Sequence, residues 1–157
     1  MHIHELLSND TVAIDLSASS RDDAISQMVD MLADHPAISD LETLRMAVLD
    51  RERTVSTGVG KGIALPHAKS SSVVATAAVF ATMKEPIEFG SLDGLPVSLI
   101  FLLVGNSESK SEHIRILSRI SRLLNQDELR NSMLTSSSGT ELLNRLKIEE
   151  MLLSTAK

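Results

Sequence analysis

The sequence predicts an α/β domain, in which helices pack on both faces of a mixed central β-sheet. Two nearly continuous apolar runs, residues 73–83 and 97–104, have the length and composition of central strands that are covered on both faces. Segments with apolar residues at helical spacing alternate with these runs along the chain. Apolar residues make up 43% of 157 residues, enough for the core of one domain, so we expect a single α/β/α sandwich over residues 1–157.

The first predicted elements are a strand and a helix. Residues 11–16 alternate between apolar and polar side chains, which is typical of a half-buried strand. Residues 21–34 carry apolar side chains at helical spacing, and Ser19 or Ser20 can cap this helix. Pro36 marks its end.

The next elements surround a glycine-rich segment. Ser39 and Glu42 have the spacing of a capping box, so a second helix is expected to begin there. Residues 56–62 contain three glycines and are expected to be irregular. Residues 63–65 then form a short strand that Pro66 stops.

The second half of the chain is expected to hold the two central strands and three helices. The segment between the two apolar runs is rich in Pro and Gly and is expected to be a connection. Ser109 and Glu112 match a capping box and open a strongly amphipathic helix. A shorter helix covers residues 127–134, and residues 138–141 cap a last one.

Composition and charge exclude several classes of function. The absence of cysteine excludes disulfides, thiol catalysis and cysteine-based metal sites. A net charge of −6 repels nucleic acid and anionic membranes, so we expect neither as a partner. Residues 1–10 lack the basic and apolar regions of a signal peptide, and the longest apolar stretch is too short to span a bilayer. We therefore expect a cytoplasmic protein without membrane insertion.

The glycine-rich segment is a candidate anion site. Glycines at alternate positions allow positive φ angles and a close approach of the backbone to a ligand. The segment matches neither a Rossmann fingerprint, since a strand rather than a helix follows it, nor a P-loop, since Lys61 precedes a glycine. The alternative is a tight turn. The candidate anion-binding loop consists of Thr57, Gly58, Val59, Gly60, Lys61 and Gly62, and the resemblance described below implies that the anion is a phosphoryl group.

His67 is the candidate nucleophile. It follows Pro66, which cannot donate a hydrogen bond to a sheet, so His67 lies where a strand is forced to stop. A histidine is largely unprotonated near neutral pH and can then attack an electrophile. The alternative is a structural histidine.

Arg51 and His113 are candidates with weaker signals of their own. Arg51 continues the apolar face of its helix and could grip a phosphoryl group, although Arg53 competes with it and a surface ion pair with Asp50 or Glu52 is the alternative. His113 lies in the first turn of a helix that follows an apolar strand, where anions bind in open α/β sheets. The alternative is a core histidine.

The remaining histidines carry less information. His2 and His4 form an H-x-H pair, but two histidines without further ligands rarely bind a metal, so we expect no metal site. His35 precedes a proline at a helix end and is expected to serve as a C-terminal cap.

Residues 56–67, STGVGKGIALPH, resemble the active-site signature of the type-two IIA domains of the bacterial phosphoenolpyruvate-dependent phosphotransferase system. This is the fructose, mannitol and nitrogen-regulatory IIA family. Residues 89–97 and 112–114 resemble later blocks of the same family, so the resemblance covers essentially the whole chain as one type-two IIA domain. Val59 and Leu65 replace a common isoleucine, and Lys61 stands where asparagine is frequent.

The resemblance implies a function and roles for the candidate residues. His67 would be phosphorylated on Nε2 by an HPr-like phosphocarrier, with Arg51 and His113 stabilising the phosphoryl oxygens, and no cofactor or metal is implied. The chain, which shows no attached IIB, IIC or HPr domain, is expected to have a nitrogen-regulatory output through target proteins. The alternative within the family is a sugar-transport IIA component that passes phosphate to a IIB domain. Two functions of a different class compete with both: a binding module that is not phosphorylated, and a metal-dependent hydrolase.

Overall fold

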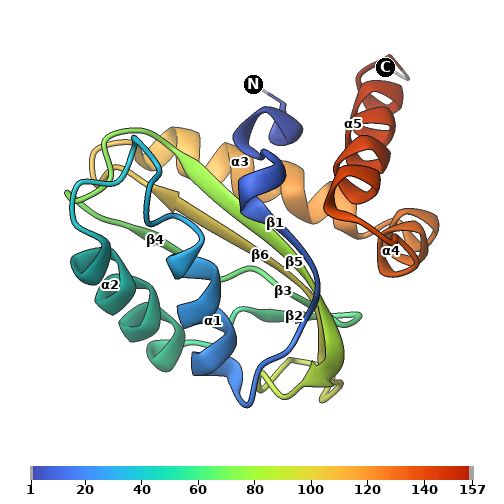
Figure 1. Ribbon diagram of the computed structural model, residues 1–157, viewed down its shortest axis with the longest axis horizontal. Helices are drawn as coiled ribbons and strands as arrows, with labels where there is room; N and C mark the ends of the chain where they lie inside the picture. Colours follow the sequence, from blue (N-terminus) through green and yellow to red (C-terminus); the bar gives the residue numbers. More distant parts are fainter. Residues whose placement is uncertain (1, 156–157) are drawn as a thin grey trace.

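A mixed six-stranded sheet lies between two layers of helices, which confirms the predicted α/β sandwich (Figure 1). The computed structural model describes residues 2–155, with side chains through Leu153. The elements are the 3₁₀ helices η1 (Ile3–Leu6) and η2 (Asn9–Thr11), the strands β1 (Val12–Leu16), β2 (Gly58–Gly60), β3 (Ile63–Ala64), β4 (His67–Lys69), β5 (Ala77–Ile87) and β6 (Val97–Gly105), and the helices α1 (Arg21–Asp30), α2 (Leu41–Thr54), α3 (Lys110–Leu124), α4 (Asp127–Leu134) and α5 (Gly139–Thr155).

The sheet has the strand order β1-β5-β6-β3-β2, and β4 pairs with β6 beyond the end of β3. Strands β5 and β6 are antiparallel, whereas β1 runs parallel to β5, and both β3 and β4 run parallel to β6. His67 pairs in register with Leu103, near the carboxyl end of β6. The candidate nucleophile therefore lies at the edge of the sheet where ligands bind in open α/β folds.

Both faces of the central strands are buried, which explains the continuous apolar runs of the sequence. Alternate residues of β6 face opposite layers: Ile100 and Leu102 pack with α1 and α2, whereas Leu99 and Phe101 pack with α3, α4 and α5. Phe80 and Phe101 meet in the second layer with their ring centroids 5.3 Å apart. Within residues 2–155 no helix has both the length and the apolar content that crossing a bilayer requires.

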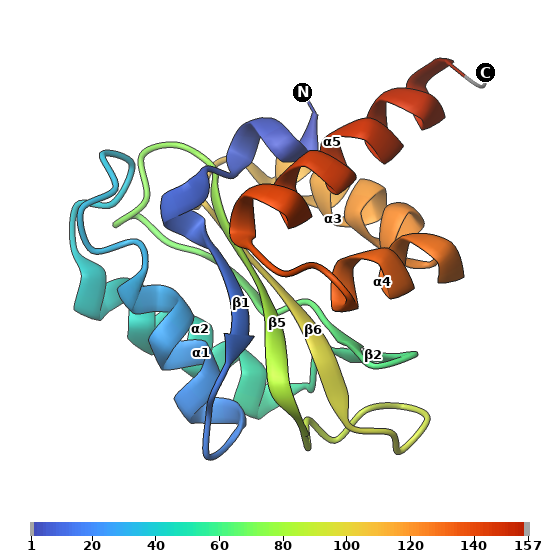
Figure 2. The same ribbon diagram turned by 45° about the vertical axis from the view of Figure 1, so that its right-hand side comes forward.

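The two ends of the described chain lie together on one face of the molecule. Figure 2 shows η1 beside α5, and contacts join η1 to both α3 and α5. The buried side chain of Ile3 belongs to the same apolar layer as those helices. The first turn of the chain is thus part of the fold.

Several element boundaries differ from the predictions. Strand β5 begins only at Ala77 and continues through Pro86 into the expected connection, because residues 84–86 are exposed and a proline is tolerated there. The glycine-rich segment is regular, since β2 and β3 form an antiparallel pair. Helix α1 ends at Asp30, before the predicted residue 34, and Ser20 is its N-cap.

The two predicted capping boxes do not form. Asp40 rather than Ser39 caps α2, by accepting a hydrogen bond from the Thr43 N–H at 3.1 Å. Ser39 instead donates its hydroxyl to the Ser72 carbonyl at 2.9 Å. Glu112 accepts the Thr76 hydroxyl at 2.6 Å. In both places one residue of the predicted capping box is hydrogen-bonded to a distant part of the chain instead.

Candidate functional site

His67 is half-buried at the start of β4, and its tautomer is set by the backbone. Its Nδ1 lies 2.7 Å from the carbonyl oxygen of Leu65. Because a carbonyl oxygen can only accept, Nδ1 carries the proton and Nε2 keeps its lone pair. Pro66, between the two residues, has a ring that fixes φ and so restricts the shape of this turn. The Leu65-Pro66-His67 turn therefore presents Nε2 as the nucleophilic atom.

The surroundings of His67 keep its ring neutral. Burial lowers the pKa of His67 below its usual value, and the positive charges of Arg51 and Lys69 lower this pKa further. The hydrogen bond to Leu65 and the charge of Glu52 act in the opposite direction but do not reverse the shift. A neutral imidazole at neutral pH is the form that can attack phosphorus.

His113 lies next to His67, as the sequence predicts for a shared site. It is buried in the first turn of α3, and the two ring centroids are 5.5 Å apart at an interplanar angle of 51°. Gly105, the last residue of β6, makes room for this ring: a Cβ there would lie 3.1 Å from Nδ1 of His113. The glycine that closes the apolar strand is thus a site residue, which the sequence analysis did not identify.

Both ring nitrogens of His113 are buried and have no hydrogen-bond partner among residues 2–155. Burial lowers the pKa of His113 from its usual value to about 4, with smaller contributions from His67 and Lys69. A neutral imidazole carries one N–H, and here that donor has no acceptor. A phosphoryl oxygen on the neighbouring His67 would supply one.

The structure separates Arg51 from the competing Arg53. Arg53 is exposed and pairs with Asp22 at 3.2 Å and Asp50 at 3.6 Å, away from the site. Arg51 is half-buried in the last turn of α2 and forms no ion pair with a residue of the described range, although Nη1 donates to the Val55 carbonyl at 3.4 Å. Helix α2 packs against β4, and the charge of Arg51 acts on the pKa of His67. Its guanidinium is the one available to an anion on His67.

Glu52 is a second residue that the sequence analysis considered only as a surface partner. Its buried carboxylate accepts the Thr57 N–H at 2.7 Å and the Thr57 hydroxyl at 2.5 Å. Thr57 in turn accepts the Leu65 N–H on its carbonyl at 3.0 Å. Glu52 therefore couples α2, which carries Arg51, to the turn that carries His67.

Lys69 is a third unrecognised contributor. It is exposed at the end of β4, two residues beyond His67, and its charge lowers the pKa of both site histidines. A strand places residues i and i+2 on the same face, so this cation lies on the His67 side of β4. In the sequence, this proximity could have been inferred from the two-residue spacing of His67 and Lys69.

The structure does not bring most of the predicted phosphate-binding loop to His67. Gly60, Lys61 and Gly62, with φ angles of +99°, +59° and +77°, form the tight turn of the β2–β3 hairpin. Ile63 pairs with Leu99, four positions before the partner of His67, so this turn lies about 13 Å or more along the sheet from His67. Residues 60–62 therefore form a tight turn, the alternative to an anion-binding loop that the sequence analysis left open.

Three amides of the same segment already have acceptors. The N–H groups of Thr57, Gly58 and Lys61 donate to Glu52, to the Ser56 hydroxyl at 3.1 Å and to Asp93 at 2.9 Å. Nζ of Lys61 donates to Asn125 at 2.5 Å, and the Val59 side chain is exposed. We expected these amides to bind a phosphoryl group. The structure instead shows a hairpin that holds Thr57 beside Leu65.

The remaining histidines lie away from His67. Nδ1 of His35 accepts the Ala37 N–H at 3.1 Å in the turn after α1, so His35 stabilises the turn rather than the last carbonyls of the helix. His2 and His4 meet the carboxylate of Glu150 from α5, a third group that sequence spacing could not reveal.

The site thus combines a neutral nucleophilic imidazole, a buried imidazole with an unpaired N–H, and two cations. This combination can accept a phosphoryl group and stabilise its negative oxygens.

Comparisons with known proteins point to one family, and a solved structure of a similar protein has the same fold. The family described as "Phosphoenolpyruvate-dependent sugar phosphotransferase system, EIIA 2" matches residues 5–148. The fructose-specific EIIABC component of Bacillus subtilis (strain 168) is 34% identical over 144 residues, which are 92% of this chain and 23% of that protein. The chain therefore spans about a quarter of the length of this relative.

Two nitrogen regulatory proteins match over most of both chains. The protein of that name from Bradyrhizobium diazoefficiens is 29% identical over 136 residues, which cover 87% of this chain and 88% of that protein. The crystal structure of nitrogen regulatory protein IIA-Ntr from Neisseria meningitidis has a TM-score of 0.85 and 29% identity, and the match covers 92% of this chain and 98% of that one.

Proposed function

Because the chain belongs to the EIIA type-two family of the phosphoenolpyruvate-dependent sugar phosphotransferase system, we propose that it is a phosphocarrier whose phosphorylated atom is Nε2 of His67. The observation that carries the proposal is the hydrogen bond from Nδ1 of His67 to Leu65, which leaves Nε2 as the free nucleophile. The donor is the phosphohistidine of an HPr-like carrier protein, and the chain acts in the cytoplasm.

The transfer exchanges one P–N bond for another. Nε2 of His67 attacks phosphorus in line with the donor nitrogen, the donor P–N bond breaks, and its electron pair returns to the donor imidazole. Nδ1 keeps its proton throughout, held by the Leu65 carbonyl. Since a phosphoimidazole is present on both sides, the step is nearly balanced in free energy and can run in either direction. It needs positioning and charge stabilisation rather than a metal or cofactor.

The phosphoryl oxygens find complementary groups on two sides. His113 donates its unpaired N–H, and Arg51 offers a planar guanidinium that can bind two oxygens at once. The exposed side chain of Lys69 adds positive charge beside His67. These groups counter the overall net charge of −6, which would otherwise disfavour a phosphorylated state.

We propose a regulatory output, in which the phosphorylation state of His67 changes what the chain binds. Similarity to the two nitrogen regulatory proteins over most of both chains supports this output. The alternative is a transport role, in which His67 passes its phosphoryl group to a IIB domain. The 34% identity to the fructose-specific component of Bacillus subtilis supports this alternative.

Fructose uptake distinguishes the two outputs. A strain that lacks this chain is complemented with the wild-type protein or with His67→Ala. The regulatory proposal predicts equal fructose uptake in both strains, whereas a transport role requires that uptake be lost with His67→Ala.

Phosphoryl labelling tests the carrier function itself. The chain is mixed with radiolabelled phosphoenolpyruvate, enzyme I and HPr, and the label on it is measured. We expect acid-labile label on the wild type and on His35→Ala, which removes a histidine remote from the site, and none on His67→Ala. Label on His67→Ala at the wild-type level would refute the assignment.

A further inference from the structure

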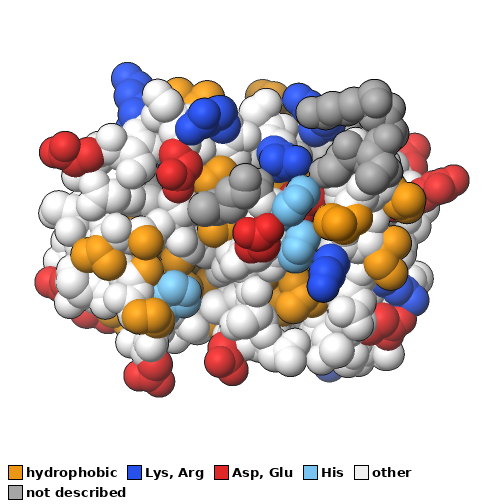
Figure 3. Space-filling view, turned by 90° about the horizontal axis from the view of Figure 1, so that it is seen from above, with side chains coloured by type: hydrophobic (Ala, Val, Ile, Leu, Met, Phe, Trp, Pro, Cys, Tyr) orange, Lys and Arg blue, Asp and Glu red, His pale blue; other side chains and the backbone are white. Residues whose placement is uncertain are grey.

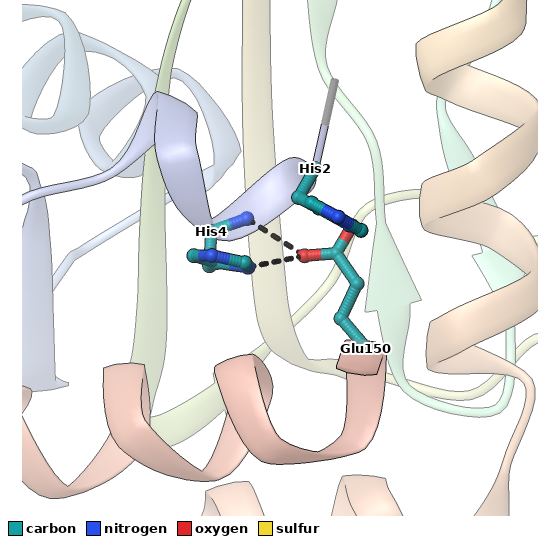
Figure 4. A group of neighbouring side chains, drawn as sticks. All are labelled: His2, His4 and Glu150. Atoms are coloured by element: carbon teal, nitrogen blue, oxygen red, sulfur yellow. Dashed lines mark hydrogen bonds and ion pairs between the residues drawn. The ribbon is translucent and has the colours of Figure 1, made fainter. Parts of the chain in front are cut away.

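A second cluster of histidines joins the two ends of the chain. His2 and His4 of the first turn lie against Glu150 of α5, as Figure 4 shows. Nδ1 of His4 lies 2.8 Å from Oε1 of Glu150, and Nδ1 of His2 lies 3.7 Å from Oε2. One nitrogen or oxygen atom from each of the three side chains lies within 4.8 Å of the other two. Three potential metal ligands therefore converge on one point.

The carboxylate of Glu150 is buried and held in place by hydrogen bonds. It is only 1% exposed, and although burial raises its pKa, hydrogen bonds from the backbone N–H groups of His4 and Ile3 and from the side chain of His4 together lower it. The His4 N–H donates to Oε1 at 2.9 Å and the Ile3 N–H to Oε2 at 2.5 Å. The group is a preoriented anion that faces both imidazoles.

His2 provides an independent sign that a partner belongs at this point. Its Nδ1 is buried, yet it has no hydrogen-bond partner among the described residues. The ring stacks on that of His4, with centroids 5.3 Å apart and planes inclined by 19°. A buried imidazole nitrogen that makes no hydrogen bond costs free energy, and a metal ion would satisfy it.

We propose that His2, His4 and Glu150 form a binding site for a divalent transition-metal ion of the Zn²⁺ class. Two imidazole nitrogens and one carboxylate oxygen are a ligand set that Zn²⁺ uses, with water in the fourth tetrahedral position. Ligand bonds of about 2 Å place ligand atoms roughly 3.3 Å apart, close to the His4–Glu150 separation. His2, the more exposed of the two histidines, closes the remaining gap by rotating its ring.

Binding at Nδ1 of His4 requires a change of tautomer. In the free protein Nδ1 of His4 donates its one proton to Oε1 of Glu150, and on binding that proton moves through solvent to Nε2, so that Nδ1 offers its lone pair to the metal. Oε1 becomes the metal ligand. Oε2 remains held by the Ile3 N–H and by Arg119, whose Nε lies 3.4 Å away. Such outer partners orient a ligating carboxylate.

The site would fasten the beginning of the chain to its last helix. His2 precedes η1 and His4 belongs to it, whereas Glu150 lies in the fourth turn of α5. Figure 3, a view of the molecule from above, shows two adjacent histidine side chains at the surface, with both acidic and cationic side chains nearby. Since Arg119 shares the carboxylate, we expect moderate affinity, with a Kd on the order of 10 µM.

The test measures metal binding directly, on the 157-residue chain without a polyhistidine tag. Zn²⁺ is titrated by calorimetry, and Co²⁺ is titrated as a spectroscopic probe of tetrahedral coordination. We expect one ion per chain and a rise in Tm of about 5 °C at saturating Zn²⁺, reversed by EDTA. Absence of binding at 0.1 mM Zn²⁺, roughly tenfold above the expected Kd, would overturn the proposal.

Variants locate the ion. His2→Ala removes the more exposed of the two histidine ligands and is expected to weaken metal binding by about tenfold or more. His4→Gln is expected to weaken it similarly, and His35→Ala serves as the matched control with wild-type binding. Unchanged affinity in His2→Ala, or equal losses in His2→Ala and His35→Ala, would contradict the site. Because the readout is binding and Tm, failure here leaves the function of His67 untouched.

Discussion

At the scale of single residues, the burial of His113 links stability to pH. Its pKa is about 4 in the folded chain, against an ordinary value of 6.5. Between these values the unfolded chain binds more protons, so stability is complete above pH 6.5 and is lost as the pH falls toward 4. We expect His113 to account for a loss of about 2 kcal/mol in the free energy of unfolding between pH 7.5 and 5.

Urea unfolding of the wild type and of His113→Gln at both pH values isolates this contribution, because glutamine does not titrate. The stability advantage of the wild type over the variant should shrink by that amount at pH 5. An advantage that stays constant or grows on acidification would show that His113 titrates normally.

The second prediction at this scale concerns the unpaired N–H of His113. If it donates to a phosphoryl oxygen, His113→Ala should slow phosphoryl transfer from HPr by on the order of 100-fold, the usual effect of removing one stabilising donor. His113→Gln keeps an N–H donor and should recover part of the rate. Rapid-quench kinetics measures both, and transfer at the wild-type rate in His113→Ala would make this histidine purely structural.

The sequence points to the candidate reactive side chains more directly than to the groups that contact them. His67, Arg51 and His113 stand in a recognisable pattern of side chains. The partner of Nδ1 in His67 is a backbone carbonyl, which no residue type signals. Glu52 looked like a surface charge, because only the packed structure shows that its carboxylate turns inward to Thr57.

At the scale of elements, the β2–β3 hairpin depends on glycine for space as well as for turn geometry. A Cβ at Gly58 would lie 2.3 Å from Oγ and 3.0 Å from Cα of Ser91. We expect Gly58→Ala to destabilise the fold by about 1–3 kcal/mol, because the clash with the backbone atom cannot be relieved by a rotamer change.

Urea unfolding of Gly58→Ala and of Gly58→Ala combined with Ser91→Ala measures this effect. The second substitution removes the Oγ clash but leaves the Cα clash, so only part of the stability should return. Wild-type stability in the single variant would contradict the close approach.

The long elements were predictable because burial dictated their composition, whereas the short ones depend on tertiary contacts. Strands β5 and β6 and helices α3 and α4 follow from apolar pattern. Strand β4 has three residues and is a strand only because it pairs with β6. The caps of α2 and α3 differ from prediction because Ser39 and Glu112 bind Ser72 and Thr76, which are distant in sequence.

At the scale of the whole molecule, one sheet supports both apolar layers. Adjacent residues of β6, such as Ile100 and Phe101, belong to opposite layers, so neither layer can persist without the sheet. We therefore propose that residues 1–157 form one cooperative domain. Far-UV circular dichroism and calorimetry should give a single transition with coincident midpoints. Two separated transitions would contradict a single unit.

The central claim concerns one atom, Nε2 of His67. The most direct measurement is NMR of ¹⁵N-histidine-labelled protein after phosphorylation by phosphoenolpyruvate, enzyme I and HPr, with the ³¹P–¹⁵N coupling identifying the phosphorylated nitrogen. The hydrogen bond from Nδ1 to Leu65 predicts a single phosphohistidine, coupled through Nε2 of His67. Phosphorus coupled to Nδ1 of His67, or to the ring of any other histidine, would contradict the account.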